Sequence, residues 1–203
     1  MALSSYLHLA KAPVGDAPLV FAFHGTGGDE HQFFGLIDQM LPQAGIIAPR
    51  GDVSEHGANR FFRRTGEGVY DMADLARRSV QMTAFIRAHS AAHPTAPVYG
   101  LGYSNGANIL ASVLFGAAGL FDRVVLMHPL IPWTPEPAAG LAKTAVLITA
   151  GKRDPICPLP LTKALADYFT AQGSQTDLAL HDGGHEVRPE ELSRIAQFLQ
   201  AKG

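Results

Sequence analysis

The hydrophobic residues of this 203-residue chain fall into short runs that are separated by longer amphipathic stretches. Runs rich in β-branched and aromatic residues predict strands, and several of these runs are apolar at every position instead of alternating with polar residues. Strands of that kind belong to a sheet that helices cover on both faces. Seven strands are predicted, over residues 6–9, 19–23, 45–48, 98–101, 123–127, 145–149 and 177–180.

Between most of these strands the apolar residues recur at spacings of three and four, which predicts helices. Residues 33–41 follow this pattern, and so do residues 192–199, which come after Pro189 at a predicted helix start. Strands that alternate with helices form a mostly parallel sheet. We therefore expect an α/β fold with a mostly parallel central sheet of about seven strands and helices on both faces. Residues 49–70 form one long irregular connection, and connections of that length are usually functional or mobile.

The composition narrows the class of protein. With 47% hydrophobic and 17% charged residues, the chain is predicted to fold as one domain over residues 1–203 and not to be disordered. The 16 Lys and Arg against 18 Asp and Glu give a net charge of -2, which argues against nucleic acid as a partner. The longest apolar run, residues 109–121, is too short for membrane insertion, and the N-terminus lacks a signal-peptide pattern. Cys157 is the only cysteine, so we expect no internal disulfide, no cysteine-bound zinc and a cytoplasmic location.

Residues 102–106 read Gly-Tyr-Ser-Asn-Gly, a G-x-S-x-G motif between the predicted strand 98–101 and the apolar stretch 107–114. A serine on a sharp turn between a strand and a helix has its hydroxyl exposed at the edge of the sheet. In a chain with 21 glycines the pentapeptide is also compatible with an ordinary glycine-rich turn. Its position after a buried strand favours Ser104 as a nucleophile.

A serine nucleophile needs a histidine that takes its proton and a carboxylate that orients the histidine. On this kind of fold these residues follow in the chain order Ser, acid, His. Asp154 comes after the strand 145–149 and is the predicted acid. His185 follows two glycines that permit a tight loop and is the predicted base, with His181 as the alternative. These two histidines are spaced like a metal-binding pair, but the glycines between them disrupt the helix that such a pair needs. We therefore expect no metal.

Residues 24–28, His-Gly-Thr-Gly-Gly, form a glycine-rich loop between the strand 19–23 and a predicted helix. Such a loop can direct backbone amides at the oxyanion that forms when a serine attacks an ester carbonyl. We assign this role to the amides of Thr26 and Asn105. The alternative is a phosphate-binding loop, but the chain lacks the lysine of a P-loop and the G-x-G-x-x-G pattern.

Three arginines in the long connection are candidates for substrate binding, because ligands bind at the carboxyl edge of such a sheet. One of Arg60, Arg63 and Arg64 is expected to face the site and to favour substrates that carry a carboxylate or a phenolate. The alternative, with comparable weight, pairs the arginines with nearby acids such as Glu55.

Two further residues are candidates for contacts with the substrate. His128 ends the strand 123–127 and is expected near the rim of the site. Trp133 is expected to line one wall, with a surface-packed aromatic as the alternative.

Four motifs together resemble the phospholipase/carboxylesterase family of small α/β-hydrolases. They are H-G-T-G-G at 24–28, G-Y-S-N-G at 102–106, D-P-I-C-P at 154–158 and G-G-H at 183–185. The segments R-G-D-V-S-E-H-G-A-N-R-F-F-R-R at 50–64 and G-V-Y-D-M-A-D-L at 68–75 resemble, more narrowly, bacterial hydrolases associated with resistance to hydroquinones. The resemblance implies a serine carboxylesterase with nucleophile Ser104, acid Asp154 and base His185 that acts without a cofactor.

We therefore predict an α/β-hydrolase fold that hydrolyses small carboxylic esters through an acyl-enzyme intermediate, with a link to the detoxification of aromatic compounds and hydroquinones. The chain has little room for a cap domain, so an open or shallow site is expected. An acyl thioesterase would use the same machinery. A catalytically silent protein that binds a small ligand is the alternative outside the enzymes. The sequence leaves the acyl length and the formation of a homodimer open.

Overall fold

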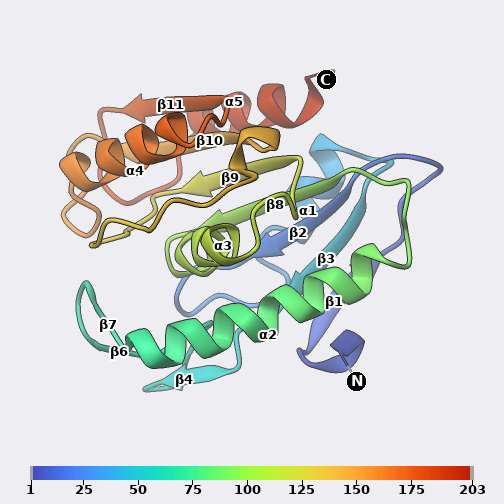
Figure 1. Cartoon of the computed structure of the whole chain (residues 1–203), viewed down its shortest axis with the longest axis horizontal. Coiled ribbons are helices and arrows are strands. Elements are labelled where there is room, and N and C mark those ends of the chain that lie inside the picture. Colours follow the sequence, from blue (N-terminus) through green and yellow to red (C-terminus); the bar gives the residue numbers. More distant parts are fainter. Residues whose placement is uncertain (1, 202–203) are drawn as a thin grey trace.

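A seven-stranded sheet forms the centre of the protein in the computed structural model, which describes residues 2–201 (Figure 1). The strand order is β1-β3-β2-β8-β9-β10-β11, and all neighbouring strands are parallel except β1 and β3. The predicted mostly parallel sheet is thus confirmed, with one antiparallel strand at its edge. The strands are β1 (His8–Lys11), β2 (Leu19–Phe23), β3 (Gly45–Pro49), β8 (Val98–Tyr103), β9 (Arg123–Met127), β10 (Ala145–Gly151) and β11 (Thr176–His181).

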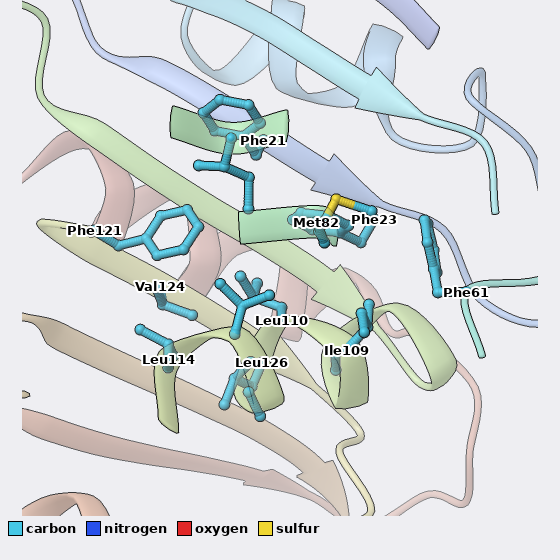
Figure 2. Close-up of a cluster of buried hydrophobic side chains, with 14 of the residues drawn as sticks. Phe21, Phe23, Phe61, Met82, Ile109, Leu110, Leu114, Phe121, Val124 and Leu126 are labelled. Carbon is cyan, nitrogen blue, oxygen red and sulfur yellow. The ribbon is translucent and has the colours of Figure 1, made fainter. Parts of the chain in front are cut away.

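Helices cover both faces of this sheet, as the apolar strands predict. Alternate side chains of a strand point to opposite faces, so Phe21 and Phe23 of β2 join one hydrophobic cluster while Val20 and Ala22 join the other. The first cluster packs under α2, α3 and α4, and the second packs under α1 and α5. Figure 2 shows part of the first cluster, where side chains from β2, β9, α2 and α3 meet. The helices are α1 (Phe34–Met40), α2 (Met72–Ser90), α3 (Asn105–Gly116), α4 (Leu159–Ala171) and α5 (Pro189–Gln200), with short 3-10 turns at Ala2–Ser4 and Leu141–Lys143.

Within residues 2–201, no helix is both long enough and apolar enough to cross a lipid bilayer.

The long connection between β3 and α2 is not irregular, and this part of the sequence prediction is wrong. It contains two hairpins, β4 (Val53–Glu55) with β5 (Ala58–Arg60) and β6 (Arg64–Gly66) with β7 (Val69–Tyr70). The first hairpin turns at His56 and Gly57, which both have positive φ, as a tight two-residue turn requires. These strands are short and largely polar, so the hydrophobic pattern does not reveal them. Within the described residues, the two short hairpins are the elements inserted between β3 and α2, and no separate cap domain is inserted there.

The order of the strands reverses between β2 and β8, which lie side by side. From β2 the chain continues outward to β3, which pairs with β1 at the edge, and from β8 it continues outward in the other direction through β9 and β10 to β11. At such a point the loops that follow the two strands diverge and leave a crevice at the carboxyl edge of the sheet. Phe23 at the end of β2 pairs with Gly102 in β8, so the loop 24–28 and the turn at Ser104 begin next to each other.

Candidate active site

Ser104 lies in a sharp turn between β8 and α3, with φ 51° and ψ -114°. A residue with a side chain seldom adopts this backbone conformation, and such strain is typical of functional sites. The flanking glycines permit the turn, because a Cβ at Gly102 would lie 2.6 Å from the carbonyl oxygen of Gly106. The Ser104 amide donates a hydrogen bond to the carbonyl of Met127 in β9, at 2.8 Å. The G-x-S-x-G motif therefore has the strand, turn and helix that expose a serine hydroxyl.

The structure brings the three side chains predicted as catalytic into one hydrogen-bonded line. His185, in the loop between β11 and α5, has its Nε2 2.9 Å from the Oγ of Ser104. The Nδ1 of the same ring lies 2.7 Å from the Oδ2 of Asp154, in the loop after β10. A nucleophile, a base and an orienting carboxylate need this order of contacts.

The side chain of Asp154 is fully buried, and its surroundings keep it ionised. The amides of Ile156 and Cys157 donate to its Oδ1 at 2.8 and 2.9 Å. Burial by itself raises the pKa of Asp154, but the hydrogen bonds from the Cys157 amide, His128 and His185 outweigh it and hold the pKa below its ordinary value. The carboxylate is therefore charged at neutral pH and able to orient His185.

Tyr103, which directly precedes the serine, holds the histidine loop in place. Its hydroxyl donates to the carbonyl oxygen of His185 at 2.7 Å, and the two rings lie 5.4 Å apart between centroids. Burial raises the pKa of Tyr103 to about 12, so the hydroxyl keeps its proton and remains a donor. Gly25 leaves room for this ring, because a Cβ there would lie 2.6 Å from Cδ1 of Tyr103. The strand β8, which ends at Tyr103 directly before Ser104, thus also positions His185.

Gly151 at the end of β10 packs directly against the glycines of the histidine loop. A Cβ at this position would lie 2.5 Å from the carbonyl oxygen of Gly183 and closer still to that of Gly184. We expect Gly151→Ala to displace His185 and to lower kcat/KM by about 10- to 100-fold, since a misplacement of about 1 Å has effects of this size. Activity assays on Gly35→Ala, whose added Cβ in α1 meets nothing within 4 Å, give the matched control. Wild-type activity of Gly151→Ala would contradict this packing argument.

A small cavity of about 30 Å³ lies beside Ser104 and has both residues of the predicted oxyanion hole in its lining. Thr26 comes from the loop after β2, and its Oγ1 accepts a hydrogen bond from Arg60 at 2.7 Å. The side-chain oxygen of Asn105 accepts from the amide of Phe61 at 2.8 Å, and its Nδ2 is buried without a partner among residues 2–201. The cavity thus receives polar groups from both sides of the crevice. The assignment of the two backbone amides to an oxyanion hole stays a prediction.

Two of the three candidate arginines line this cavity, and the third does not. Arg60 and Arg64 are part of its lining, whereas Arg63 is exposed outside it and its amide donates to the carboxylate of Asp74. Arg63, which directly precedes β6, thus does not line this cavity, and the arginine that binds the substrate stays a prediction. Arg60 and Arg64 also share the carboxylate of Glu55, at 3.3 and 2.8 Å. Arg60 and Arg64 therefore line the cavity and also pair with an acid, and their role in substrate binding stays a prediction.

His128 does not lie at the rim of the site, so that expectation is wrong. Its side chain is fully buried, and its backbone turns away from the strand direction with φ 49°. Nδ1 lies 3.0 Å from Oδ2 of Asp154, and Nε2 lies 3.4 Å from Oε2 of Glu191. His128 therefore contacts the orienting carboxylate and is not in the lining of the cavity beside Ser104.

Trp133 is also not part of the cavity lining. Its ring packs edge-on against Tyr70, with 5.9 Å between the centroids, and it lines an apolar groove between α2 and α3 instead. Tyr70 does line the cavity, and its hydroxyl donates to the carbonyl of Leu130 at 2.8 Å. Tyr70 therefore lines the wall of the cavity that was expected for Trp133. The expectation that Trp133 lines the site is wrong.

Sequence reasoning missed Glu191, which is buried on α5. Its Oε1 accepts from the hydroxyl of Thr149, and the amide of Arg188 donates to its Oε2 at 3.3 Å. A signal was present, because Glu191, Ile195 and Phe198 are spaced by four and three and so lie on one face of the helix. A carboxylate on the apolar face of an amphipathic helix needs a buried partner.

His181, the alternative base, faces Glu191 and not Ser104. Its Nε2 lies 3.4 Å from Oε2 of Glu191, and its Nδ1 accepts a hydrogen bond from the amide of Gly183 at 3.0 Å. An imidazole nitrogen that accepts a hydrogen bond carries no proton, so in the neutral ring the proton is on Nε2. His181 is therefore a donor to Glu191.

Two groups of side chains bring atoms of metal-ligating type within 4.8 Å of one another. They are His128, His181 and Glu191, and His128, Asp154 and His185. A metal ligand must offer a free lone pair, whereas the hydrogen bonds described above place protons on Nε2 of His181 and on Nδ1 of His128. These contacts support a hydrogen-bonded network in both groups.

The strand order, the strained serine turn and the Ser-His-Asp contacts define an α/β-hydrolase. No family model matches the chain. The Bacillus subtilis (strain 168) protein MhqD, which is named as a hydrolase, is 34% identical over 195 residues, or 95% of this chain and 97% of that protein. On these grounds the chain belongs to the phospholipase/carboxylesterase family of small α/β-hydrolases.

Solved structures agree with this membership. The crystal structure of the Bacillus cereus carboxylesterase is 30% identical, covers 97% of this chain and 94% of that chain, and has a TM-score of 0.91. A protein of unknown function from Agrobacterium tumefaciens str. C58 is 55% identical over the full length of both chains, with a TM-score of 0.96.

Proposed function

We propose that the protein is a serine carboxylesterase in which Ser104 is the nucleophile, His185 the general base and Asp154 the orienting acid. The observation that carries the proposal is the pair of contacts made by His185, at 2.9 Å to Ser104 Oγ and 2.7 Å to Asp154 Oδ2. Family membership supports an esterase activity, since a carboxylesterase is among the solved relatives.

In the first half of the proposed reaction, Ser104 Oγ attacks the ester carbonyl carbon while His185 Nε2 takes the hydroxyl proton. The carbonyl oxygen becomes an oxyanion, for which we propose the amides of Thr26 and Asn105 as donors. Asp154 stabilises the imidazolium that forms at His185 without itself taking the proton. Collapse of the tetrahedral intermediate breaks the ester bond, and the imidazolium gives its proton to the departing alcohol.

In the second half, His185 takes a proton from a water molecule, and the resulting hydroxide attacks the acyl carbon on Ser104. A second tetrahedral intermediate releases the carboxylic acid, and His185 returns the proton to Ser104 Oγ. Every proton that leaves a reacting oxygen thus passes through Nε2 of His185.

The size of the site favours small esters, and its arginines favour an anionic or phenolic group. The cavity beside Ser104 has room for about one or two water molecules, so the surrounding side chains leave little space beyond the reacting carbonyl. Arg60 and Arg64 are balanced in charge by Glu55 and Glu67 at its edge, and their guanidinium N–H groups are donors for an anionic or phenolic oxygen of the substrate. The resemblance of residues 50–64 to hydrolases associated with resistance to hydroquinones extends the proposal to esters of aromatic compounds.

Arg64 gives a testable prediction about this preference. Its side chain is about a quarter exposed and lines the cavity, whereas Arg60 also holds Thr26 and is unsuitable for a clean substitution. Arg64→Ala is expected to lower kcat/KM for an anionic ester by about fivefold relative to a neutral ester of equal size, as a partly solvated charge contact of about 1 kcal/mol gives. Arg63→Ala, at an exposed position outside the cavity, is the matched control. Equal discrimination by all three proteins would remove Arg64 from the substrate site.

The proposed function is tested by labelling the native protein with a fluorophosphonate, which reacts with activated serines. We expect one adduct, which peptide mass spectrometry locates at Ser104, and no adduct on Ser104→Ala. A panel of short chromogenic esters and thioesters measured alongside separates an esterase from an acyl thioesterase. A native protein that is neither labelled nor active on the panel would instead be a ligand-binding member of the fold.

A further inference from the structure

A buried chain of ionisable groups continues the catalytic line beyond Asp154. His128 Nδ1 lies 3.0 Å from the same Oδ2 of Asp154 that accepts from His185, and His128 Nε2 lies 3.4 Å from Oε2 of Glu191. The side chains of His128, Asp154 and Glu191 have between 0% and 2% of their surface exposed. Contacts thus run without interruption from the hydroxyl of Ser104 to the carboxylate of Glu191. The residues that make them come from the loops after β8, β9, β10 and β11 and from α5, which Figure 1 locates.

The hydrogen bonds define the protonation state of His128. Nδ1 faces Oδ2 of Asp154, which is an acceptor only, so this nitrogen carries a proton. Nε2 lies 3.4 Å from Oε2 of Glu191 and 3.5 Å from Nε2 of His181, and the nearby carboxylate favours a proton on this nitrogen as well. Burial opposes a charge on this ring, but the hydrogen bonds with Glu191 and Asp154 outweigh burial and raise the pKa of His128 above its ordinary value. Glu191 is correspondingly ionised, because its hydrogen bonds with His128 and Thr149 outweigh burial and lower its pKa. His128 is therefore an imidazolium between two carboxylates.

The backbone at His128 is strained in the same way as at the nucleophile. Positive φ values occur at only three non-glycine residues of the described chain, and two of them are Ser104 and His128. These two residues follow the neighbouring strands β8 and β9 directly, at the edge of the sheet that holds the site. A left-handed conformation costs about 1 kcal/mol or more for a residue with a side chain and persists where the surroundings require it. At His128, the contacts with Asp154 and Glu191 hold the residue in this conformation.

We propose that His128, held by Glu191, is a positioning residue for Asp154, and that its charge sets the electrostatic balance around His185. The proposal rests on the proposed function, since it assigns a role to groups behind the nucleophile. Asp154 accepts hydrogen bonds from the rings of His128 and His185. A positive charge on His128 also reduces the repulsion between Asp154 and the second buried carboxylate, Glu191. Without that charge, two buried carboxylates would lie close together with no cation between them, which disfavours their common ionisation.

The other groups around His128 leave this balance in place. Nε2 of His181 lies 3.4 Å from Oε2 of Glu191 and 3.5 Å from Nε2 of His128, and the ring of His185 lies 5.2 Å from that of His128 between centroids. The Cys157 thiol donates to the carbonyl of His128 at 3.2 Å, and burial raises the pKa of this thiol, so it carries no charge. The ring of Tyr103 lies 5.8 Å away, with a protonated hydroxyl. The charges near His128 are thus those of Asp154 and Glu191, joined by His185 when it takes a proton.

The direction of the effect on catalysis follows from this arrangement. His185 must be neutral to act as a base, and the positive charge of His128 close by opposes its protonation, whereas Glu191 favours it. Removal of the His128 charge leaves Glu191 uncompensated and makes the site more negative. Protonation of His185 then becomes easier, so activity is lost at a higher pH as the solution is acidified.

The experiment is a pH profile of kcat/KM for a neutral ester with four variants. Asn has a side-chain N–H in the place of His Nδ1 and tolerates positive φ, so His128→Asn keeps the donor to Asp154 and removes the charge. We expect the midpoint of the acid limb to rise by about one pH unit in His128→Asn, within the range that a neighbouring charge at this distance produces. Glu191→Gln is expected to lower the midpoint. The double variant, in which both charges are gone, is expected to return close to the wild-type midpoint.

His181→Asn is the matched control, because it changes another hydrogen-bond donor to the same carboxylate and is expected to leave the midpoint unchanged. An acid limb that stays at the wild-type midpoint in both His128→Asn and Glu191→Gln, with only lowered kcat or thermal stability, would show a merely structural role and overturn the proposal. If His128→Asn does not fold, the shift in Glu191→Gln decides alone. Nitrogen-15 NMR of wild-type protein gives an independent readout, since a neutral His128 at pH 7 would equally overturn the proposal.

Failure of this inference is distinguishable from failure of the proposed function. Fluorophosphonate labelling of Ser104 at alkaline pH, above the acid limb of every variant, is expected to persist in His128→Asn. Labelling that persists while the pH midpoints do not move contradicts only the role of His128. Absence of labelling in wild-type protein contradicts the serine mechanism itself.

Discussion

Replacement of Ser104 with Ala is expected to lower kcat/KM for ester hydrolysis by at least about 10⁴-fold, because the whole chemical step depends on one hydroxyl. The fold is expected to survive. Ser104 Oγ makes its hydrogen bond to His185, a partly solvent-exposed side chain, so the free energy of unfolding should change by about 1 kcal/mol or less. Steady-state kinetics and thermal unfolding on the same preparations measure the two quantities.

Ser112→Ala provides the control for this variant. Ser112 lies two turns further along α3, where its hydroxyl donates to the carbonyl of Asn108 at 2.8 Å, and it lines the apolar groove away from the cavity. Its removal tests the loss of a serine hydroxyl on the same helix without any contact to His185. A Ser104→Ala protein that hydrolyses esters at the wild-type rate would rule out Ser104 as the nucleophile.

The fold could be predicted where hydrophobic burial alone determines the structure. The strands Leu19–Phe23 and Arg123–Met127 have the predicted bounds, because both are buried runs that end at a change to polar or glycine-rich sequence. The hairpins between residues 53 and 70 have no such signal, since their strands are two or three residues long and mix charged with small side chains. The available signals were the glycines at their turns, Gly57 and Gly68, which both have positive φ.

The candidate site could be predicted as far as it depends on the ends of parallel strands. Ser104, Asp154 and His185 each follow a strand of the same sheet, so their meeting at one edge follows from topology. The role of His128 depends instead on Glu191, which is 63 residues away and belongs to α5. Sequence spacing cannot reveal such a pair, because the packing of α5 against β10 and β11 decides which of its residues point inward. The same holds for Tyr70, which replaces Trp133 as a wall of the cavity.

Replacement of Asp154 with Asn is expected to lower kcat by about 10³- to 10⁴-fold, which is the second large effect that the geometry predicts. The Asp154 carboxylate accepts from His185, from His128 and from two backbone amides. An Asn side chain can keep its oxygen on the backbone amides only by turning its NH₂ group toward the two rings. His185 would then accept at Nδ1 and carry its proton on Nε2, the atom that must take the proton of Ser104.

The same substitution should also destabilise the protein, because an NH₂ group would face the protonated Nδ1 of His128. The pKa of Asp154 is lowered in the folded state, so its contribution to stability is present at neutral pH and is lost as the pH falls below the ordinary range of a carboxyl group. The stability difference between wild type and Asp154→Asn should therefore be largest near pH 7 and shrink toward acid, as urea unfolding at several pH values can measure. Asp177→Asn, which removes a half-exposed partner of Arg194, is the control and should change neither kcat nor this pH dependence by a measurable amount. A difference that stays constant from pH 7 to pH 3 would mean that Asp154 is not held ionised by these donors.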